Sequence, residues 1–69
     1  MRFIFIPHAV EEMLEIGVTS GEVRETVVTG MKFGPDSRRR MHARRRGIEV
    51  VFERRGQTFK IITVFIAKR

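Results

Sequence analysis

Two histidines and a dense group of arginines are the residues of this chain whose chemistry stands out. Six of the eleven arginines lie in the ten-residue stretch 38–47, which also holds His42: Arg38, Arg39, Arg40, Arg44, Arg45 and Arg46. A guanidinium group binds phosphate oxygens in a bidentate manner, and an imidazole can move a proton near neutral pH. Cleavage of RNA without a metal needs this set: a base, an acid and cations for the charged phosphorane.

The alternation around His42 predicts a half-buried strand, because successive side chains of a strand point to opposite faces. Met41 and Ala43 would point one way. The other face would hold Arg40, His42 and Arg44, with His42 roughly 7 Å from each arginine, a span that one phosphate and its sugar can bridge. The neighbouring charges should favour the neutral imidazole, the form that acts as a base. We therefore take His42 and Arg44 as candidate catalytic residues.

The partner strand should be residues 48–53, and two registers compete for this hairpin. A two-residue loop, Arg46-Gly47, matches apolar groups with one another and opposite charges with one another: Met41 with Phe52, Ala43 with Val50, Arg44 with Glu49, and Arg40 with Glu53. A three-residue loop mixes the two faces, setting Arg40 against Phe52 and Ala43 against Glu49. We expect the two-residue loop, although Arg-Gly is a weaker hairpin signal than Asn-Gly. In this register both Arg40 and Arg44 have glutamate partners. The alternative to a catalytic role for His42 is therefore that it belongs to an ordinary salt-bridged sheet surface.

The first half of the chain predicts one strand and two helices. Residues 2–6 form a strand that is apolar on both faces apart from its first residue. A helical stripe covers residues 7–16 and stops at Gly17. Thr19 and Glu22 fit a capping box that begins a second helix, which runs to about residue 29 and stops at Gly30. Residues 31–37, which include Gly34-Pro35-Asp36, are predicted to be a loop.

The longest apolar strand, residues 58–66, follows a turn at Gly56. Because it is apolar on both sides, we expect it inside the sheet, with the first strand as its other neighbour. Strict alternation puts Phe59, Ile61, Thr63 and Phe65 on the Met41 face. It leaves an apolar patch on the His42 face, made of Val51, Ile62, Val64 and Ile66, which a partner, a loop or a chain terminus would cover. The predicted fold is α+β, in the order β-α-α-β-β-β, with both helices on one face of an antiparallel sheet.

The 69 residues form one domain, which buries only about 60% of the surface that its unfolded chain exposes. The core must come from two helices on a sheet or from a homodimer. Without cysteine or a recognised ligand spacing, we expect no disulfide, no metal and no cofactor. The N-terminus fits neither a signal peptide nor a membrane span, so the expected location is the cytoplasm.

Charge is distributed unevenly along the chain. Residues 1–37 carry three basic and six acidic groups, and residues 38–69 carry eleven basic and two acidic groups. Such asymmetry suggests a polyanionic partner, nucleic acid before membrane, because no basic amphipathic helix is evident. The alternatives are a genome rich in G and C, which favours arginine over lysine, and a thermophilic source, which suits a chain without Asn and Cys.

The run His8-Ala9-x-x-x-Met13-x-x-x-Gly17-Val18-Thr19-x-x-Glu22-Val23, with Gly30 and a late Val-Val-Phe and Thr-Val-Phe, resembles the domain-of-unknown-function family 4258. That family looks related to the BrnT and RelE-like toxins. The resemblance implies two helices followed by an antiparallel meander, and a small toxin-like ribonuclease or a non-catalytic relative, often paired with an antitoxin. The chain departs from the pattern at Glu12 and Ile16, where the family favours arginine.

The resemblance also singles out two residues. His8 matches the family's hallmark and would lie in the first turn of the first helix, where backbone amides attract anions. Its alternative role is to fix the start of that helix. Thr63 matches another family position, and by strict alternation it would face the helices and satisfy a hydrogen bond there.

Three hypotheses from different classes follow. The leading one is a RelE-like domain that contacts RNA through the basic hairpin, as a metal-independent endoribonuclease with His8, His42 and Arg44 as catalytic residues. The second is a nucleic-acid-binding module without catalysis, in which the six clustered arginines bind phosphates. The third is a protein-interaction domain, whose partner is an antitoxin or a second copy of the chain. We expect no membrane partner.

Overall fold

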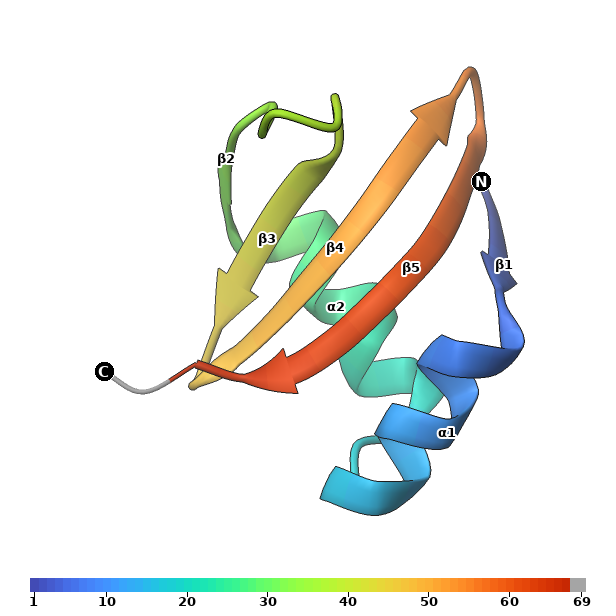
Figure 1. Ribbon diagram of the computed structural model, residues 1–69, viewed down its shortest axis with the longest axis vertical. Helices are drawn as coiled ribbons and strands as arrows, with labels where there is room; N and C mark the ends of the chain where they lie inside the picture. Colours follow the sequence, from blue (N-terminus) through green and yellow to red (C-terminus); the bar gives the residue numbers. More distant parts are fainter. Residues whose placement is uncertain (68–69) are drawn as a thin grey trace.

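The computed structural model describes residues 1–67 and has the element order β-α-α-β-β-β-β. The strands are β1 (Arg2–Phe5), β2 (Met31–Phe33), β3 (Met41–Arg45), β4 (Ile48–Arg55) and β5 (Thr58–Ile66), and the helices are α1 (Pro7–Ile16) and α2 (Ser20–Thr29). The strands form one sheet of order β1-β5-β4-β3-β2, in which β1 and β5 are parallel and the other pairs antiparallel (Figure 1). The predicted α+β class is confirmed, and so is the position of β5 inside the sheet beside the first strand.

Both helices begin and end where their sequence signals predict. Gly17, with a φ of 75°, ends α1 in the left-handed conformation. The capping box of α2 is formed, because the Thr19 hydroxyl accepts the Glu22 amide and the Glu22 carboxylate accepts the Thr19 amide. Within residues 1–67, neither helix is long and apolar enough to span a membrane.

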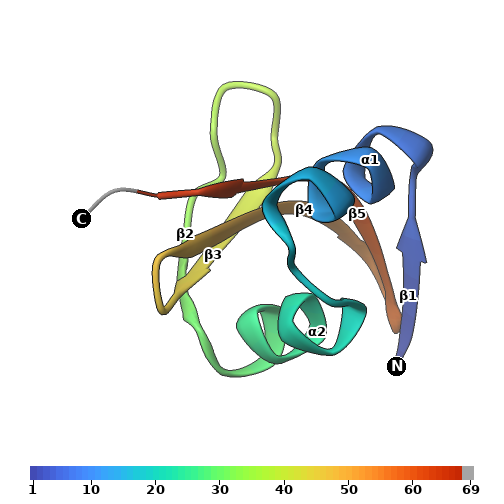
Figure 2. The same ribbon diagram turned by 90° about the horizontal axis from the view of Figure 1, so that it is seen from below.

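The core lies between the two helices and one face of the sheet. It joins helix residues Ala9, Met13, Val23 and Val27 to sheet residues Ala43, Val50, Phe52, Phe59, Ile61 and Val64. We call this sheet face the inner face and the opposite one the outer face. Figure 2 shows α1 beside β5, with α2 packed under β3 and β4.

The β3–β4 hairpin has the predicted register. Met41 is opposite Phe52, Ala43 is opposite Val50, and Arg44 is opposite Glu49. Its loop consists of Arg46 and Gly47, whose φ angles of 51° and 79° are both positive, as a type I′ turn requires. The two-residue loop is therefore confirmed.

One extra residue in β5 overturns part of the predicted facing. Val51 is opposite Thr63, but the next residue, Phe52, is opposite Ile61, so Ile62 forms a bulge. Phe59 and Ile61 lie on the inner face as predicted. The bulge moves Thr63 and Phe65 to the outer face and Val64 to the inner one. The predicted outer patch of Val51, Ile62, Val64 and Ile66 is therefore wrong, and Val51 and Ile62 are themselves buried.

Part of the predicted loop 31–37 is a strand. Met31–Phe33 forms β2 at the edge of the sheet, where Met31 is opposite Arg44 and Phe33 is opposite His42. Three residues between two glycines are too few to show an alternating pattern, so the pairing with β3 and not the local sequence creates this strand. Residues 34–40 form the β2–β3 loop.

Candidate nucleic-acid interface

Strand β3 divides the six clustered arginines into two groups. Arg38, Arg39 and Arg40 precede the strand, while Arg44, Arg45 and Arg46 lie at its other end. Arg40 and Arg44 are four residue steps apart along the strand, which corresponds to about 13 Å. A single phosphate group therefore cannot meet both groups. We call the end of the sheet with the β2–β3 loop and the β4–β5 turn, at the top of Figure 1, the loop end.

Half of the six arginines are paired with carboxylates. Arg40 lies 3.1 Å from Glu53, Arg44 lies 2.7 Å from Glu49, and Arg45 lies 3.2 Å from Glu25 of α2. The remaining three, Arg38, Arg39 and Arg46, have no carboxylate within 4.0 Å among residues 1–67. Paired arginines have part of their charge neutralised, so the unpaired ones are the better phosphate ligands.

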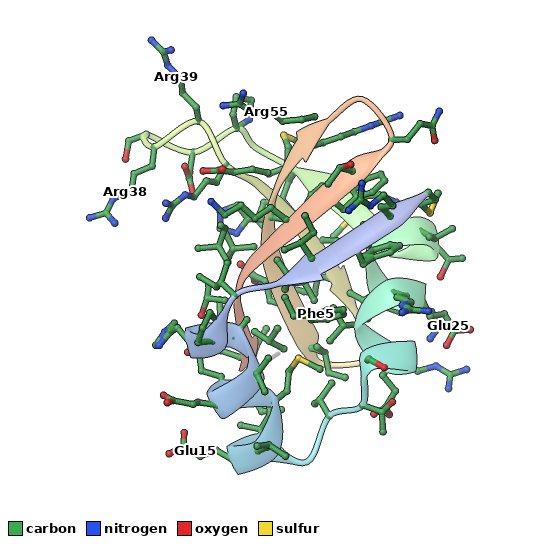
Figure 3. All side chains as sticks on the ribbon, turned by 90° about the vertical axis from the view of Figure 1, so that its right-hand side faces the viewer. Phe5, Glu15, Glu25, Arg38, Arg39 and Arg55 are labelled. Atoms are coloured by element: carbon green, nitrogen blue, oxygen red, sulfur yellow. The ribbon has the colours of Figure 1, made fainter. Side chains whose placement is uncertain are left out.

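Four arginines surround one depression at the loop end. Its volume is about 350 Å³, and its lining residues are Arg38, Arg39, Met41, Glu53, Arg54 and Arg55. Within the described part of the chain, none of the four guanidinium groups forms an ion pair. Figure 3 shows Arg38, Arg39 and Arg55 projecting from this end of the molecule. We call Arg38, Arg39, Arg54 and Arg55 the loop-end arginines.

Arg54 and Arg55 were not among the predicted phosphate ligands. In a hairpin, the start of the first strand and the end of the second lie at the same end. The register that pairs Met41 with Phe52 therefore brings residues 54 and 55 to the end where the β2–β3 loop lies. The signal was present in the sequence, but it required the register to be extended by two residues.

The β2–β3 loop is organised by Asp36. Its Oδ1 accepts the backbone amides of Arg38 at 2.8 Å and Arg40 at 3.0 Å, and its own amide donates to the carbonyl of Arg40 at 2.9 Å. Arg39 has a φ of 64°, which is uncommon for a residue other than glycine. These bonds hold the backbone that carries Arg38 and Arg39 in one conformation.

His42 is held between two carboxylates. Its Nδ1 lies 2.7 Å from Oε2 of Glu49, and its Nε2 lies 2.8 Å from Oδ2 of Asp36. Glu49 also accepts two hydrogen bonds from Arg44, at 2.7 and 3.1 Å. The ring of Phe33 stacks on the imidazole, with 5.0 Å between the ring centroids. Both ring nitrogens of His42 are thus engaged.

These contacts favour the imidazolium. Partial burial lowers the pKa of His42, but the hydrogen bonds to Asp36 and Glu49 outweigh it and raise the pKa above its ordinary value of 6.5. The hydrogen bond from His42, followed by that from the Arg40 amide, lowers the pKa of Asp36 to about 2. Burial raises the pKa of Glu49, but Arg44 and His42 outweigh it, so the net direction is downward. The expectation of a neutral imidazole is therefore wrong, because carboxylates and not arginines are hydrogen-bonded to the ring.

An imidazolium that donates both its protons to carboxylates has no lone pair with which to accept another. The candidate role of His42 as a general base therefore loses its geometric support. Its contacts instead make it a clamp between the β2–β3 loop and β4. Among residues 1–67, no group of three or more His, Asp or Glu residues is placed to hold a metal ion.

His8 lies apart from this network. Its side chain is 63% exposed, and its Nε2 lies 3.4 Å from Oε2 of Glu12. The other oxygen of Glu12 accepts the amide of Val64 at 3.0 Å and the hydroxyl of Thr63. Since β1 pairs with β5 only as far as Ile61, Glu12 covers the edge of β5 beyond that point. Thr63 lies on the outer face, contrary to the expected facing, but it does bond to a helix.

The two histidines are not brought together. Phe33, His42, Val51 and Thr63 form one row across the outer face. His42 and Thr63 are separated by two strand spacings, about 10 Å, and His8 lies beyond Thr63 on α1. The arrangement therefore contains no acid–base pair of His8 and His42 poised over a single phosphate.

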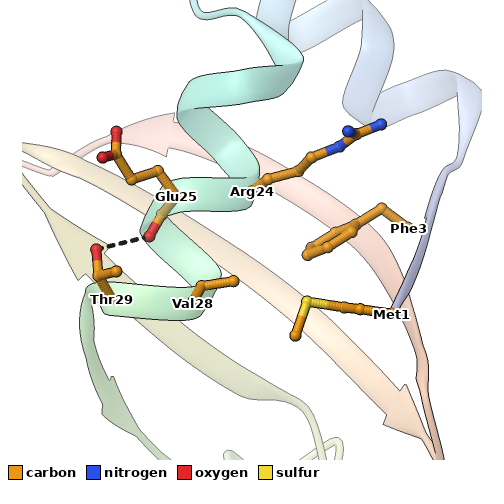
Figure 4. A pocket seen from close by; sticks show the side chains of 6 residues that line it. All are labelled: Met1, Phe3, Arg24, Glu25, Val28 and Thr29. Atoms are coloured by element: carbon orange, nitrogen blue, oxygen red, sulfur yellow. Dashed lines mark hydrogen bonds between the residues drawn. The ribbon is translucent and has the colours of Figure 1, made fainter.

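A second depression, of about 450 Å³, lies between β1 and α2 and is shown in Figure 4. Its lining residues are Met1, Phe3, Arg24, Glu25, Val28 and Thr29. Arg24 lies over the ring of Phe3, 5.7 Å from its centroid. With one cation, one carboxylate and a mostly apolar wall, this depression is less suited to phosphate than the loop end is.

Comparison with known proteins finds no match to a family model, to a curated protein or to a solved structure. The predicted membership of family 4258, and with it the RelE-like relationship, has no support from a match. The α+β class rests on the topology of the chain itself. Its function must accordingly be inferred from the geometry of its own residues.

Proposed function

We propose that this protein binds RNA without cleaving it, through the loop-end arginines. The observation that supports the proposal is the gathering of four guanidinium groups without an ion pair, two from the β2–β3 loop and two from the end of β4, around one depression. Like charges held close together repel one another, and an anion between them relieves the repulsion. Guanidinium groups suit phosphate in particular, because their donors match its oxygens in pairs.

The backbone at Arg39 supports the same proposal. Arg39 has a φ of 64° at the tip of the β2–β3 loop. The left-handed conformation costs about 1–2 kcal/mol for a residue with a Cβ atom, and glycine or asparagine would adopt it more readily. An arginine that occupies such a position is typical of a site where the side chain has a function.

The nuclease form of the hypothesis has weaker support. His42 is hydrogen-bonded to carboxylates at both ring nitrogens, and His8 lies on α1, where its ring contacts Glu12. Catalysis by His8, His42 and Arg44 stays a prediction, which an assay of RNA fragments tests alongside binding. The cytoplasm, where RNA is present, is the location that fits the proposal.

The test is a titration of labelled single-stranded RNA with the purified protein at several salt concentrations. If the four arginines each contact one phosphate, log K should fall with log salt with a slope of about −3, from about 0.7 per phosphate for single strands. Arg39→Gln and Arg55→Gln should each weaken binding and reduce the slope by about 0.7. The same incubations, made with chelator, are analysed for cleaved RNA.

Arg46→Gln is the matched control, because it removes the same charge from an unpaired arginine at the opposite end of β3. It should weaken binding much less than Arg55→Gln. Equal losses in the two variants would show that the charge acts diffusely and that the loop end is not the site. Absence of binding at low salt would refute the proposal. If the wild-type protein produces RNA fragments and the His42→Ala variant does not, the nuclease hypothesis is restored.

A further inference from the structure

Two phenylalanines are exposed on the outer face of the sheet. Phe33 and Phe65 each retain 38% of their accessible surface. Phe33 is opposite His42, and Phe65 is opposite Glu49, which in turn is opposite Arg44, so both rings lie on the outer face. The buried residues of both helices pack against the inner face instead. Large apolar side chains that stay exposed together on one face, among polar residues, mark interaction surfaces.

Two cationic side chains lie against the ring of Phe33. The guanidinium of Arg44 lies 5.6 Å from the centroid of the Phe33 ring, and the imidazole of His42 stacks on the same ring. Arg44 keeps 42% of its side chain exposed. Phe33, His42 and Arg44 thus form a stacked group in which the Arg44 guanidinium stays partly exposed to solvent, while Asp36 and Glu49 balance the charge of the two cations. Proteins that bind single-stranded RNA stack its bases on aromatic rings and on guanidinium planes of this kind.

The stacked group also adjoins the proposed phosphate site. Phe33 directly precedes the β2–β3 loop, whose Asp36 bonds to His42 and whose tip carries Arg38 and Arg39. A strand of RNA with its phosphates at the loop end would therefore place its next bases over Phe33. Phe65 lies three strand spacings across the sheet and two residues further along β5, about 16 Å away, within reach of further bases of the same strand.

We propose that the outer face is a stacking platform for the bases of single-stranded RNA, with Phe33, Arg44 and Phe65 as the stacking residues. This inference rests on the proposed function and adds the class of RNA to it. A duplex would be excluded, because its bases already stack on one another and cannot also lie on the rings. A second copy of the chain fits less well, since it would bring together two molecules that each carry a formal charge of +6.

The test uses tryptophan as a reporter, because the chain contains neither Trp nor Tyr. Phe33→Trp and Phe65→Trp each place one fluorophore on the platform, where a stacked base quenches its emission. Leu14→Trp is the matched control, because Leu14 is 78% exposed on α1, away from the outer face. Three probes are used: a single-stranded RNA of about ten nucleotides, a ribose-phosphate chain of the same length without bases, and an RNA duplex. The length lies within the roughly 4–16 nucleotides that small single-strand-binding domains cover.

The single-stranded RNA should quench Phe33→Trp and Phe65→Trp, while the chain without bases should bind but leave the emission unchanged. Phe33→Leu and Phe65→Leu, which keep an apolar side chain in the strand, should each weaken binding of the RNA about 5- to 100-fold. They should leave binding of the chain without bases unaffected. If Phe33→Leu does not fold, as judged by circular dichroism, Phe65→Leu and the two tryptophan variants decide the question.

The outcomes separate the platform from the phosphate site. If the chain without bases binds as tightly as the RNA, or if the duplex binds best, the platform is wrong while the loop-end site stands. If no probe binds, both proposals are wrong. If Phe33→Leu and Phe65→Leu instead convert a dimer into a monomer in sedimentation, the outer face is an interface between copies and the platform is again wrong.

Discussion

The chemistry of His42 is decided by residues that are remote from it in the sequence. Its neighbours along the strand, Arg40 and Arg44, suggested a base kept neutral by positive charge. The register placed Glu49 opposite Arg44 correctly, but Glu49 also reaches the imidazole. The contact between Asp36 and His42 could not be predicted from the sequence. The loop that brings Asp36 to His42 is held by hydrogen bonds from backbone amides to the Asp36 carboxylate. Local patterns predicted the facing of His42 and not its protonation.

The contacts of His42 make the stability of the fold depend on pH. The folded pKa of His42 is raised above 6.5, so its contribution is fully present below pH 6.5 and is lost as the pH rises through the folded value. The folded pKa of Asp36 is lowered from 3.8 to about 2, so its contribution is present above pH 3.8 and is lost as the pH falls towards 2. We therefore expect this network to stabilise the fold most between these limits.

Urea unfolding at about pH 5.0 and about pH 9.0 checks this expectation. These two values lie below and above the ordinary pKa of histidine. When the pH is raised from the lower to the higher value, the free energy of unfolding should fall more for the wild-type protein than for His42→Gln. Glutamine keeps hydrogen-bonding groups but does not titrate. His8→Gln removes the exposed histidine and is the control, which should keep the wild-type dependence. An equal pH dependence in the wild type and in His42→Gln would contradict the clamp.

Whole elements were predicted correctly where several independent signals agree. The capping box at Thr19, the glycine after each helix and the pairing of opposite charges across β3 and β4 each pointed to one structure. The predictions are wrong where a single residue determines which face the following side chains take. Ile62 reverses the facing of the last part of β5, and no feature of the apolar run 58–66 distinguishes a bulge from a regular strand. Strand β2 exists only through its pairing with β3.

The β3–β4 turn is the element whose sequence fits its conformation least well. A type I′ turn needs positive φ at both central residues, and Arg46 occupies the first of them with a φ of 51°. Because asparagine tolerates this conformation better than arginine, Arg46→Asn should raise the free energy of unfolding by about 0.5–1 kcal/mol. Chemical denaturation at constant pH and salt measures the change.

Gln57→Asn provides the comparison for the turn. Gln57 is the second central residue of the β4–β5 turn, where the positive φ of 59° belongs to Gly56. The same type of substitution should therefore change stability little at this position. Equal stabilisation by both variants would point to a general effect of asparagine and against strain at Arg46.

At the scale of the whole molecule, the uneven charge along the sequence becomes a spatial arrangement. Five of the acidic groups lie on the two helices, namely Glu11, Glu12, Glu15, Glu22 and Glu25. The six clustered arginines lie at the two ends of β3, and four arginines without an ion pair surround the depression at the loop end. The charge count predicted a basic second half, but only the folded chain separates paired from unpaired arginines and selects one end.

The surface of the molecule indicates that one chain is enough to complete the core. The accessible surface is 4715 Å² for a chain of 8.1 kDa, close to the roughly 4,500 Å² expected of a compact monomer of this mass. The Cα radius of gyration is 10.8 Å, against about 11 Å expected. Of the two sources of a core that the length allowed, helices on a sheet or a homodimer, the first is sufficient.

We therefore expect a monomer whose stability does not depend on its concentration. Sedimentation equilibrium should give a mass of 8.1 kDa at low and at high protein concentration, and the midpoint of urea unfolding should be the same in both. A midpoint that rises with concentration would show that folding is coupled to assembly. Because the inner face is already covered by the helices, the outer face would then be the surface that a second copy occupies, in direct competition with RNA bases at Phe33 and Phe65.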